Sequence, residues 1–205
     1  MDGDCRRFWV SETNKNKYIL KNKRSSKEIN SNLMGEHNYK NISLAVIACL
    51  QTGVSMNNCL NALKTFKGVK RRMEAVGNYK KKQIFDDFAH HPTAIEETLR
   101  GLRSRYNENR IIALIEIRSN TMKSGLHDAR LLSATNEADL VFWKGPDENQ
   151  LRNLVNQTPK NHNIMDSVDL FADKLKSSVT NEGDVIVMMS NGSFDGLANL
   201  LKSKL

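Results

Sequence analysis

Residues 84–94 of this chain read Ile-Phe-Asp-Asp-Phe-Ala-His-His-Pro-Thr-Ala, and this stretch decides the fold. Its two apolar residues and two carboxylates are typical of a β-strand that ends at a polar turn. Pro92 ends the turn, and a helix is predicted to open at Thr93, whose hydroxyl forms a capping box with Glu96. Strands that pass through a turn into a helix build α/β folds, which bind ligands at such turns.

Strands and helices are predicted to alternate from residue 73 to the end of the sequence. The predicted elements are strands at 73–79, 83–87, 111–115, 140–143, near 164 and 185–189, and helices at 93–106, 126–136, 148–156, 168–179 and from 194. An alternation of this length implies right-handed crossovers and a mainly parallel sheet with helices on both faces. We therefore predict an α/β fold class with a Rossmann-like sheet.

The first 70 residues follow another pattern. Short β segments around residues 8–10 and 18–20 precede two amphipathic helices between residues 38 and 66. The apolar side chains expected to face inward are Ile42, Ala45, Val46, Cys49, Leu50, Met56, Cys59, Leu60 and Leu63. One hairpin and two helices make a poor core, so we expect this segment to be the end of a larger domain.

Charge and composition exclude several classes of protein. The net charge is +8, and it is concentrated in residues 1–72, which carry fourteen Lys or Arg against five acids. These residues show neither aromatic–basic interleaving nor a DNA-binding motif, so we expect no nucleic-acid partner. The sequence shows no signal peptide and no apolar run long enough to span a membrane. Its three cysteines have neither an even count nor metal-ligand spacing, which favours a cytoplasmic protein.

Several motifs occur in the order in which one enzyme family carries them. They are Gly35-Glu36-His37-Asn38 followed by Asn41, Val69-Lys70-Arg71-Arg72-Met73-Glu74, Asp86-Asp87-Phe88-Ala89-His90-His91-Pro92-Thr93, and Arg118-Ser119-Asn120-Thr121-Met122-Lys123. Together they resemble motifs of the Mur ligases, ATP-dependent enzymes that build the peptidoglycan peptide. The last motif and Ser190-Asn191-Gly192 resemble the murein peptide ligase subgroup, which joins UDP-N-acetylmuramate to L-alanyl-γ-D-glutamyl-meso-diaminopimelate.

The resemblance implies a domain organisation. Residues 1–70 are expected to be the C-terminal remnant of the family's central ATP-binding domain, and residues 71–205 its C-terminal domain. The family's phosphate-binding loop, G-x-x-G-K-[ST], does not occur in this sequence. We therefore expect the N-terminal and central domains to be missing partners of this chain, and the chain alone to be inactive. ATP and Mg²⁺ are the implied cofactors, with most Mg²⁺ ligands in the missing part.

The resemblance also assigns a nucleotide site. Its residues are His37, Asn38, Asn41, Arg72 and Asp87. An amide such as Asn38 offers the adenine edge both a donor and an acceptor, although it could instead cap the helix that follows. Asp87 is expected to accept hydrogen bonds from the ribose, with Asp86 as second choice. Arg71 is expected to be a solvated charge.

The remaining assignments concern the reacting groups. His90 and His91 are expected to lie near phosphate and substrate; as zinc ligands they would need partners that the sequence does not place at useful spacing, so no metal site is predicted. The implied peptide-binding residues are Arg118, Asn120, Thr121, Lys123, Ser190 and Asn191. A guanidinium binds a carboxylate bidentately, which fits a peptide with several carboxylates. Asp195 departs from the subgroup pattern S-N-G-G-F-G-G and adds an acid there.

Two alternatives to the murein peptide ligase stay open. One is the Mur ligase that adds L-alanine to UDP-N-acetylmuramate, whose loop is expected to read H-R-Y-T-R where this chain has Arg118-Ser119-Asn120-Thr121. The other is a non-catalytic domain that binds a nucleotide or peptide.

Overall fold

The computed structural model describes residues 9–14, 17–21, 26–79, 82–157, 161–165, 167–177 and 181–204. The chain divides into two compact units, Met1–Gly68 and Val69–Leu205. Cys5 and the expected element ends at residues 8, 178 and 179 lie outside the described residues. The assignment of the first unit to a central ATP-binding domain stays a prediction.

The first unit has a sheet of its own. β1 (Trp9–Asn14), β2 (Lys17–Lys21) and β3 (Ser26–Ile29) pair antiparallel in the order β1-β2-β3. They are followed by α1 (Glu36–Gln51) and α2 (Met56–Thr65). The sequence analysis missed β3, because three of its four residues are polar and exposed and only the last is buried. The unit is therefore more than a hairpin with two helices.

A small core joins this sheet to its helices. Its buried members are Leu20, Ile29, Tyr39, Ile42, Val46 and Cys59. The prediction that Ala45 and Cys49 also face inward is wrong, since both are exposed. The buried stripe of α1 instead runs through Tyr39 and Ser43, whose hydroxyl donates to the Tyr39 carbonyl at 2.7 Å.

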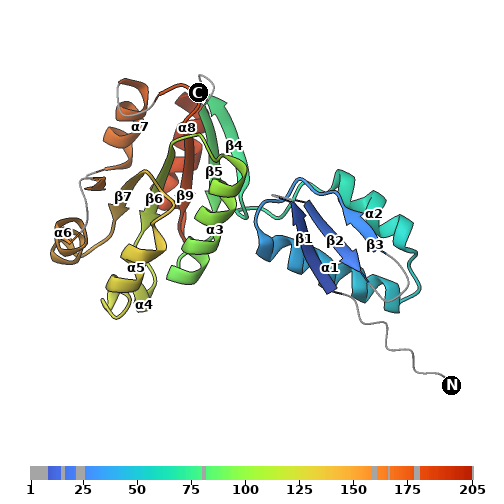
Figure 1. The fold of residues 1–205 in the computed structure, drawn as a ribbon. Helices are drawn as coiled ribbons and strands as arrows, with labels where there is room; N and C mark the ends of the chain where they lie inside the picture. The colour runs from blue at the N-terminus through green and yellow to red at the C-terminus, as the bar shows by residue number, and fades with distance from the viewer. Residues whose placement is uncertain are drawn as a thin grey trace. The chain divides into compact units, whose positions relative to one another are not determined.

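The second unit contains the predicted α/β sheet (Figure 1). Its strands are β4 (Glu74–Tyr79), β5 (Lys82–Asp87), β6 (Ile111–Glu116), β7 (Leu140–Lys144), β8 (His162–Ile164) and β9 (Val185–Met189). They lie in the order β4-β5-β9-β6-β7-β8, with β4 antiparallel to β5 and every other neighbouring pair parallel. The expected mainly parallel sheet is confirmed.

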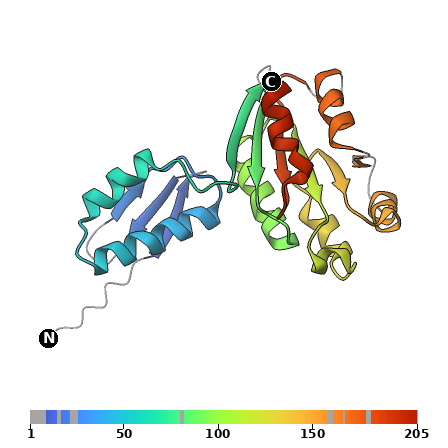
Figure 2. The same cartoon turned by 180° about the vertical axis from the view of Figure 1, so that it is seen from behind.

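Helices cover both faces of this sheet. They are α3 (Pro92–Arg105), α4 (Asn120–Lys123), α5 (Asp128–Ala134), α6 (Glu148–Asn156), α7 (Val168–Ser177), the short η1 (Phe194–Gly196) and α8 (Leu197–Lys204). Opposite views show α3 on one face and α8 on the other (Figure 1 and Figure 2). Ile112 and Ile186 project into a core cluster with Phe171 of α7 and Leu197 of α8. All six residues of β6 are buried, as expected for a strand covered on both faces.

Helix α3 begins differently from the prediction. His91 is its N-cap, with its ring Nδ1 accepting from the Thr93 amide at 3.4 Å, and Pro92 takes the first helical position. Glu96 pairs at 2.7 Å with both Arg100 and Arg130. The predicted capping box from Thr93 to Glu96 is therefore wrong.

Among the described residues, none of the helices is both long and apolar enough to cross a membrane.

Candidate functional site

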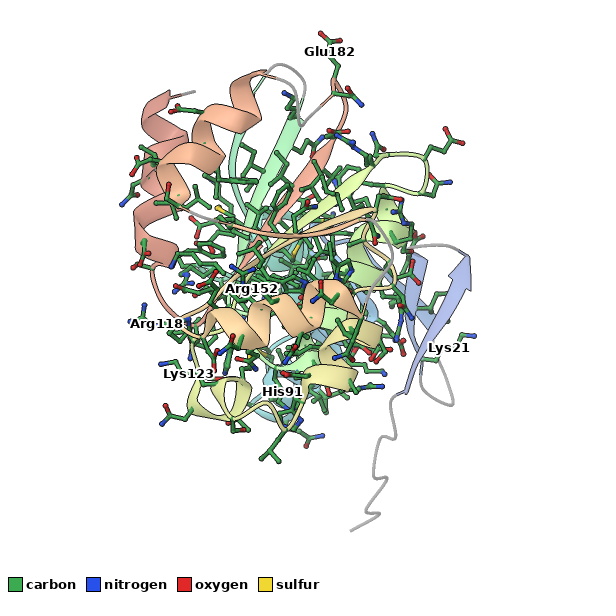
Figure 3. The ribbon with its side chains drawn as sticks, turned by 90° about the vertical axis from the view of Figure 1, so that its left-hand side faces the viewer. Lys21, His91, Arg118, Lys123, Arg152 and Glu182 are labelled. Atoms are coloured by element: carbon green, nitrogen blue, oxygen red, sulfur yellow. The ribbon has the colours of Figure 1, made fainter. Side chains whose placement is uncertain are left out.

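The polar residues singled out in the second unit gather at one edge of its sheet. The carboxyl ends of β5, β9, β6 and β7 are neighbours, with Asp87 level with Met189, and Glu116 level with Lys144. The labelled side chains of His91, Arg118 and Lys123 lie at the same end of this unit, opposite to Glu182, which precedes β9 (Figure 3). Ligands of parallel α/β folds bind at this edge, which makes it the candidate site.

Asp87 ends β5 and holds two backbone segments. Its side chain is buried, and its Oδ2 accepts from the Met73 amide and its Oδ1 from the Ala89 amide, both at 2.8 Å. Thr98 of α3 adds a hydroxyl at 3.4 Å. Met73 has a left-handed backbone (φ 53°), which is unfavourable for its side chain. The carboxylate therefore fixes residue 73 at the end of the linker, the segment of residues 69–73 that precedes β4.

The linker arginines lie against the turn after β5. The Arg71 Nε donates to Asp86 at 3.3 Å, and its Nη2 donates to the Ser190 carbonyl at 2.7 Å. The guanidinium carbons of Arg71 and Arg72 lie 5.4 and 5.5 Å from the centre of the Phe88 ring. Burial raises the pKa of Asp86, and Arg71 opposes that shift. The interpretation of Arg71 as a solvated charge is therefore wrong, while Arg72 is exposed.

The two histidines of the turn have different surroundings. His90 Nδ1 lies 2.8 Å from the Phe88 carbonyl, so this nitrogen carries the proton and Nε2 is the ring atom left for a ligand. His91 caps α3 and meets His127 of the α4–α5 connection edge to face, with ring centres 5.1 Å apart. Among the described residues, no group of three or more His, Cys, Asp or Glu is arranged to hold a metal ion.

A buried acid links three strands at the same edge. Glu116 ends β6 and is 4 % exposed. The Ser190 hydroxyl donates to its Oε2, and Lys144 Nζ lies 3.4 Å from its Oε1. Ser190 Oγ in turn accepts from the Gly192 amide at 2.8 Å. Glu116 thus fixes the turn after β9, because a buried carboxylate requires such partners.

Arg118 lies against that turn. A Cβ on Gly192 would lie 2.6 Å from Arg118 Nη1 and 2.7 Å from its Cδ and Nε, so only glycine leaves room for the guanidinium. Ser119 caps the single-turn helix α4 through the Met122 amide at 3.4 Å. The side chains of α4 that face solvent, Asn120, Thr121 and Lys123, are exposed beside it. Two cations, Arg118 and Lys123, and two neutral polar groups therefore face solvent at this edge.

Three predicted nucleotide residues lie in the first unit. They lie in α1, whose N-cap is Gly35 and not Asn38; the Asn38 amide donates to the Met34 carbonyl at 2.6 Å. His37 is partly buried and Asn41 is exposed. Their role in nucleotide binding stays a prediction, as do the roles of Arg72, Asp87 and the residues at the sheet edge.

Sequence reasoning missed Glu116, Lys144 and His127, and it singled out Gly192 only within the motif Ser190-Asn191-Gly192. An acid or a cation that directly ends an apolar run is a signal that could have found Glu116 and Lys144, since the same pattern identified Asp87. Gly192 carries a signal only as part of the turn sequence, and His127 carries none.

Residues 71–192 match the family described as Mur ligase, glutamate ligase domain. This chain belongs to the Mur ligase family. It is 37% identical over 185 residues to the UDP-N-acetylmuramate–L-alanyl-γ-D-glutamyl-meso-2,6-diaminoheptandioate ligase of Haemophilus influenzae. That match covers 87% of this chain and 40% of the relative. It is 38% identical over 173 residues to the ligase of that name from Escherichia coli K12, covering 83% of this chain and 38% of the relative.

A solved structure shows the same likeness. The murein peptide ligase of Psychrobacter arcticus superimposes with a TM-score of 0.66 at 33% identity, covering 96% of this chain and 43% of that chain. This Mur ligase chain therefore spans about two fifths of the length of the relatives it matches.

Proposed function

We propose that this Mur ligase chain is the C-terminal part of an enzyme that joins UDP-N-acetylmuramate to an acidic peptide, L-alanyl-γ-D-glutamyl-meso-diaminopimelate. The observation that carries the proposal is the loop Arg118–Lys123 at the carboxyl edge, where an exposed arginine lies in the space that Gly192 leaves free. The likeness to the diaminoheptandioate ligases supports this choice of substrate.

The reaction requires activation of a carboxylate. ATP, when bound, supplies the phosphoryl group that turns the carboxylate of UDP-N-acetylmuramate into an acyl phosphate. The peptide amine would then attack this carbonyl carbon and form the C–N bond, phosphate would leave with the C–O bond electrons, and the nitrogen would lose a proton to solvent. The residues of this chain contribute binding and orientation of the reacting groups.

The residues of the site are assigned three different roles. Arg118 and Lys123 are proposed to hold peptide carboxylates, since a planar guanidinium matches a carboxylate and an ammonium adds a less directional charge. His90 Nε2 and His91 are proposed to face the acyl phosphate, and the Nε2–H of His91 is the donor for its oxygens, because Nδ1 of that ring accepts from the Thr93 amide. Asn120, Thr121, Ser190 and Asn191 are proposed to complete the peptide site, and His37, Asn38, Asn41, Arg72 and Asp87 the nucleotide site.

A chimera tests the proposal. Residues of this chain replace the corresponding C-terminal part of the Escherichia coli relative, and amide formation is measured with the tripeptide and with L-alanine as alternative acceptors. The proposed function predicts a higher kcat/KM for the tripeptide. Faster use of L-alanine would assign the chain to the L-alanine ligases, and a folded chimera inactive with both acceptors would favour a binding domain without catalysis.

A further inference from the structure

Lys144 contacts two carboxylates of different character. Its Nζ lies 3.4 Å from Glu116 and 2.7 Å from Asp195, and its side chain is 21% exposed. Glu116 is buried and also receives the Ser190 hydroxyl, so it is a fixed part of the protein interior. The side chain of Asp195 is 55% exposed. Only Asp195 can therefore leave Lys144 without leaving a buried charge unpaired.

Asp195 forms its ion pair with Lys144 from a backbone conformation that is unfavourable for a residue with a side chain. Phe194 and Asp195 both have left-handed φ angles, 50° and 47°, which are uncommon for residues with side chains. Phe194 is 3% exposed and packs in the core, which accounts for its own position. Lys144 lowers the pKa of Asp195 through its hydrogen bond and charge, and Arg118 contributes with the same sign. Asp195 thus lies in the field of two cations, Lys144 at the end of β7 and Arg118 just after β6.

These positions resemble an occupied anion site more than a structural ion pair. Arg118 lies on the Gly192 turn with its guanidinium exposed, and Lys144 supplies the second positive charge. The ion pair of Asp195 with Lys144 is half exposed, and such pairs are weaker than buried ones, because the exposed carboxylate regains water when the two ions separate. A ligand carboxylate can bind a guanidinium such as that of Arg118 through two hydrogen bonds, whereas the contact of Asp195 is a single ion pair with Lys144.

We propose that Lys144 and Arg118 form a carboxylate-binding subsite, and that Asp195 occupies it in the free protein until an acidic ligand displaces it. The identity of that ligand as the acidic peptide rests on the proposed function, whereas the subsite itself does not. Asp195 then sets charge selectivity: a ligand with a carboxylate exchanges one anion for another, while a neutral ligand cannot.

The test uses the 205-residue chain and the Asp195→Asn variant. Asparagine tolerates a left-handed backbone better than most residues, so the turn is retained while the charge is lost. Glutarate, a plain dicarboxylate, is titrated against each protein, with the Arg118 Nε–H signal followed by nuclear magnetic resonance. We expect Asp195→Asn to bind glutarate about threefold to tenfold more tightly, because a weak competing ion pair is gone. Unchanged or weaker binding would overturn the subsite.

Two controls sharpen this result. Glu108→Gln removes an equal charge from an exposed residue in the loop before β6, at the opposite end of the strand from Glu116. It should change glutarate affinity less than twofold, and an equal gain would show that net charge alone is responsible. Adding Lys144→Gln to Asp195→Asn should remove the gain; retention of the full gain would show that Lys144 is not part of the subsite.

The tripeptide separates this inference from the proposed function. Tighter glutarate binding by Asp195→Asn, with no tripeptide binding by either protein, would keep the subsite and count against the proposed substrate. Tripeptide binding that is equal in both proteins, with no glutarate gain, would keep the substrate and overturn the role of Asp195. The inference predicts a gain with both ligands.

Discussion

Replacing Asp87 by alanine should destabilise the second unit by about 3–4 kcal/mol. The carboxylate accepts two backbone amides at 2.8 Å, from Met73 and Ala89, and is 4% exposed. Hydrogen bonds to a charged group contribute roughly 1.5–3 kcal/mol each, and water entering the space left by the side chain recovers part of that. Asp87→Asn should cost about half as much, because its amide group can accept only one of the two N–H groups and directs its own donor at the other.

Urea unfolding measures this loss. Trp143 is buried in the second unit, so in a Trp9→Phe background its fluorescence reports that unit alone. With an m-value of about 2 kcal/mol/M, Asp87→Ala should lower the midpoint by about 1.5–2 M. Glu108→Ala, at an exposed position, should shift stability by less than about 0.5 kcal/mol. A loss below about 1 kcal/mol at unchanged m would refute the claim that Asp87 holds the linker to the turn.

Three further outcomes are expected. Gly192→Ala should displace Arg118, since the new Cβ would lie 2.6 Å from its Nη1. Nuclear magnetic resonance should show that the Arg118 Nε–H signal shifts while the urea midpoint changes little. An unchanged signal would contradict the packing of Arg118 against Gly192. The stability of the second unit should fall as pH drops below about 6.5, because burial lowers the pKa of His162 and the unfolded chain takes up the proton first. In the folded unit the Trp143 indole donates to His162 at 3.1 Å. If His162→Gln leaves the pH dependence of stability unchanged, His162 is not its cause. The 205-residue chain should release no phosphate from ATP, as its sequence lacks a phosphate-binding loop, and release above a mock purification with substrates and Mg²⁺ would contradict this.

The sheet of the second unit follows from local patterns. Its strands are short apolar runs ended by polar turns, as at Asp87 and Glu116, and each is followed by residues at helical spacing. β3 escaped prediction because one buried residue, Ile29, makes no pattern. The start of α3 was misplaced because Thr93 matches a capping motif that the geometry of His91 and Pro92 overrides.

The contacts within the candidate site depend on strand order, which the sequence does not contain. β9 lies between β5 and β6, and this brings Ser190 to Glu116 and to Arg71, residues 74 and 119 positions away. The pairing of Lys144 with Asp195 likewise requires β7 and the turn after β9 to share one edge. Residue types could therefore be singled out from the sequence, whereas their partners required the fold.

The central claim is that the loop at residues 118–123 selects an acidic peptide. The most direct measurement is the ratio of kcat/KM for the tripeptide to that for L-alanine in the chimera, with and without Arg118→Ala. Arg152→Ala, which removes an exposed arginine from α6, is the matched control. We predict that Arg118→Ala lowers the ratio about tenfold to a hundredfold while KM for ATP stays constant, as expected for the loss of a bidentate carboxylate contact. An unchanged ratio in Arg118→Ala, or an equal fall in Arg152→Ala, would contradict the claim.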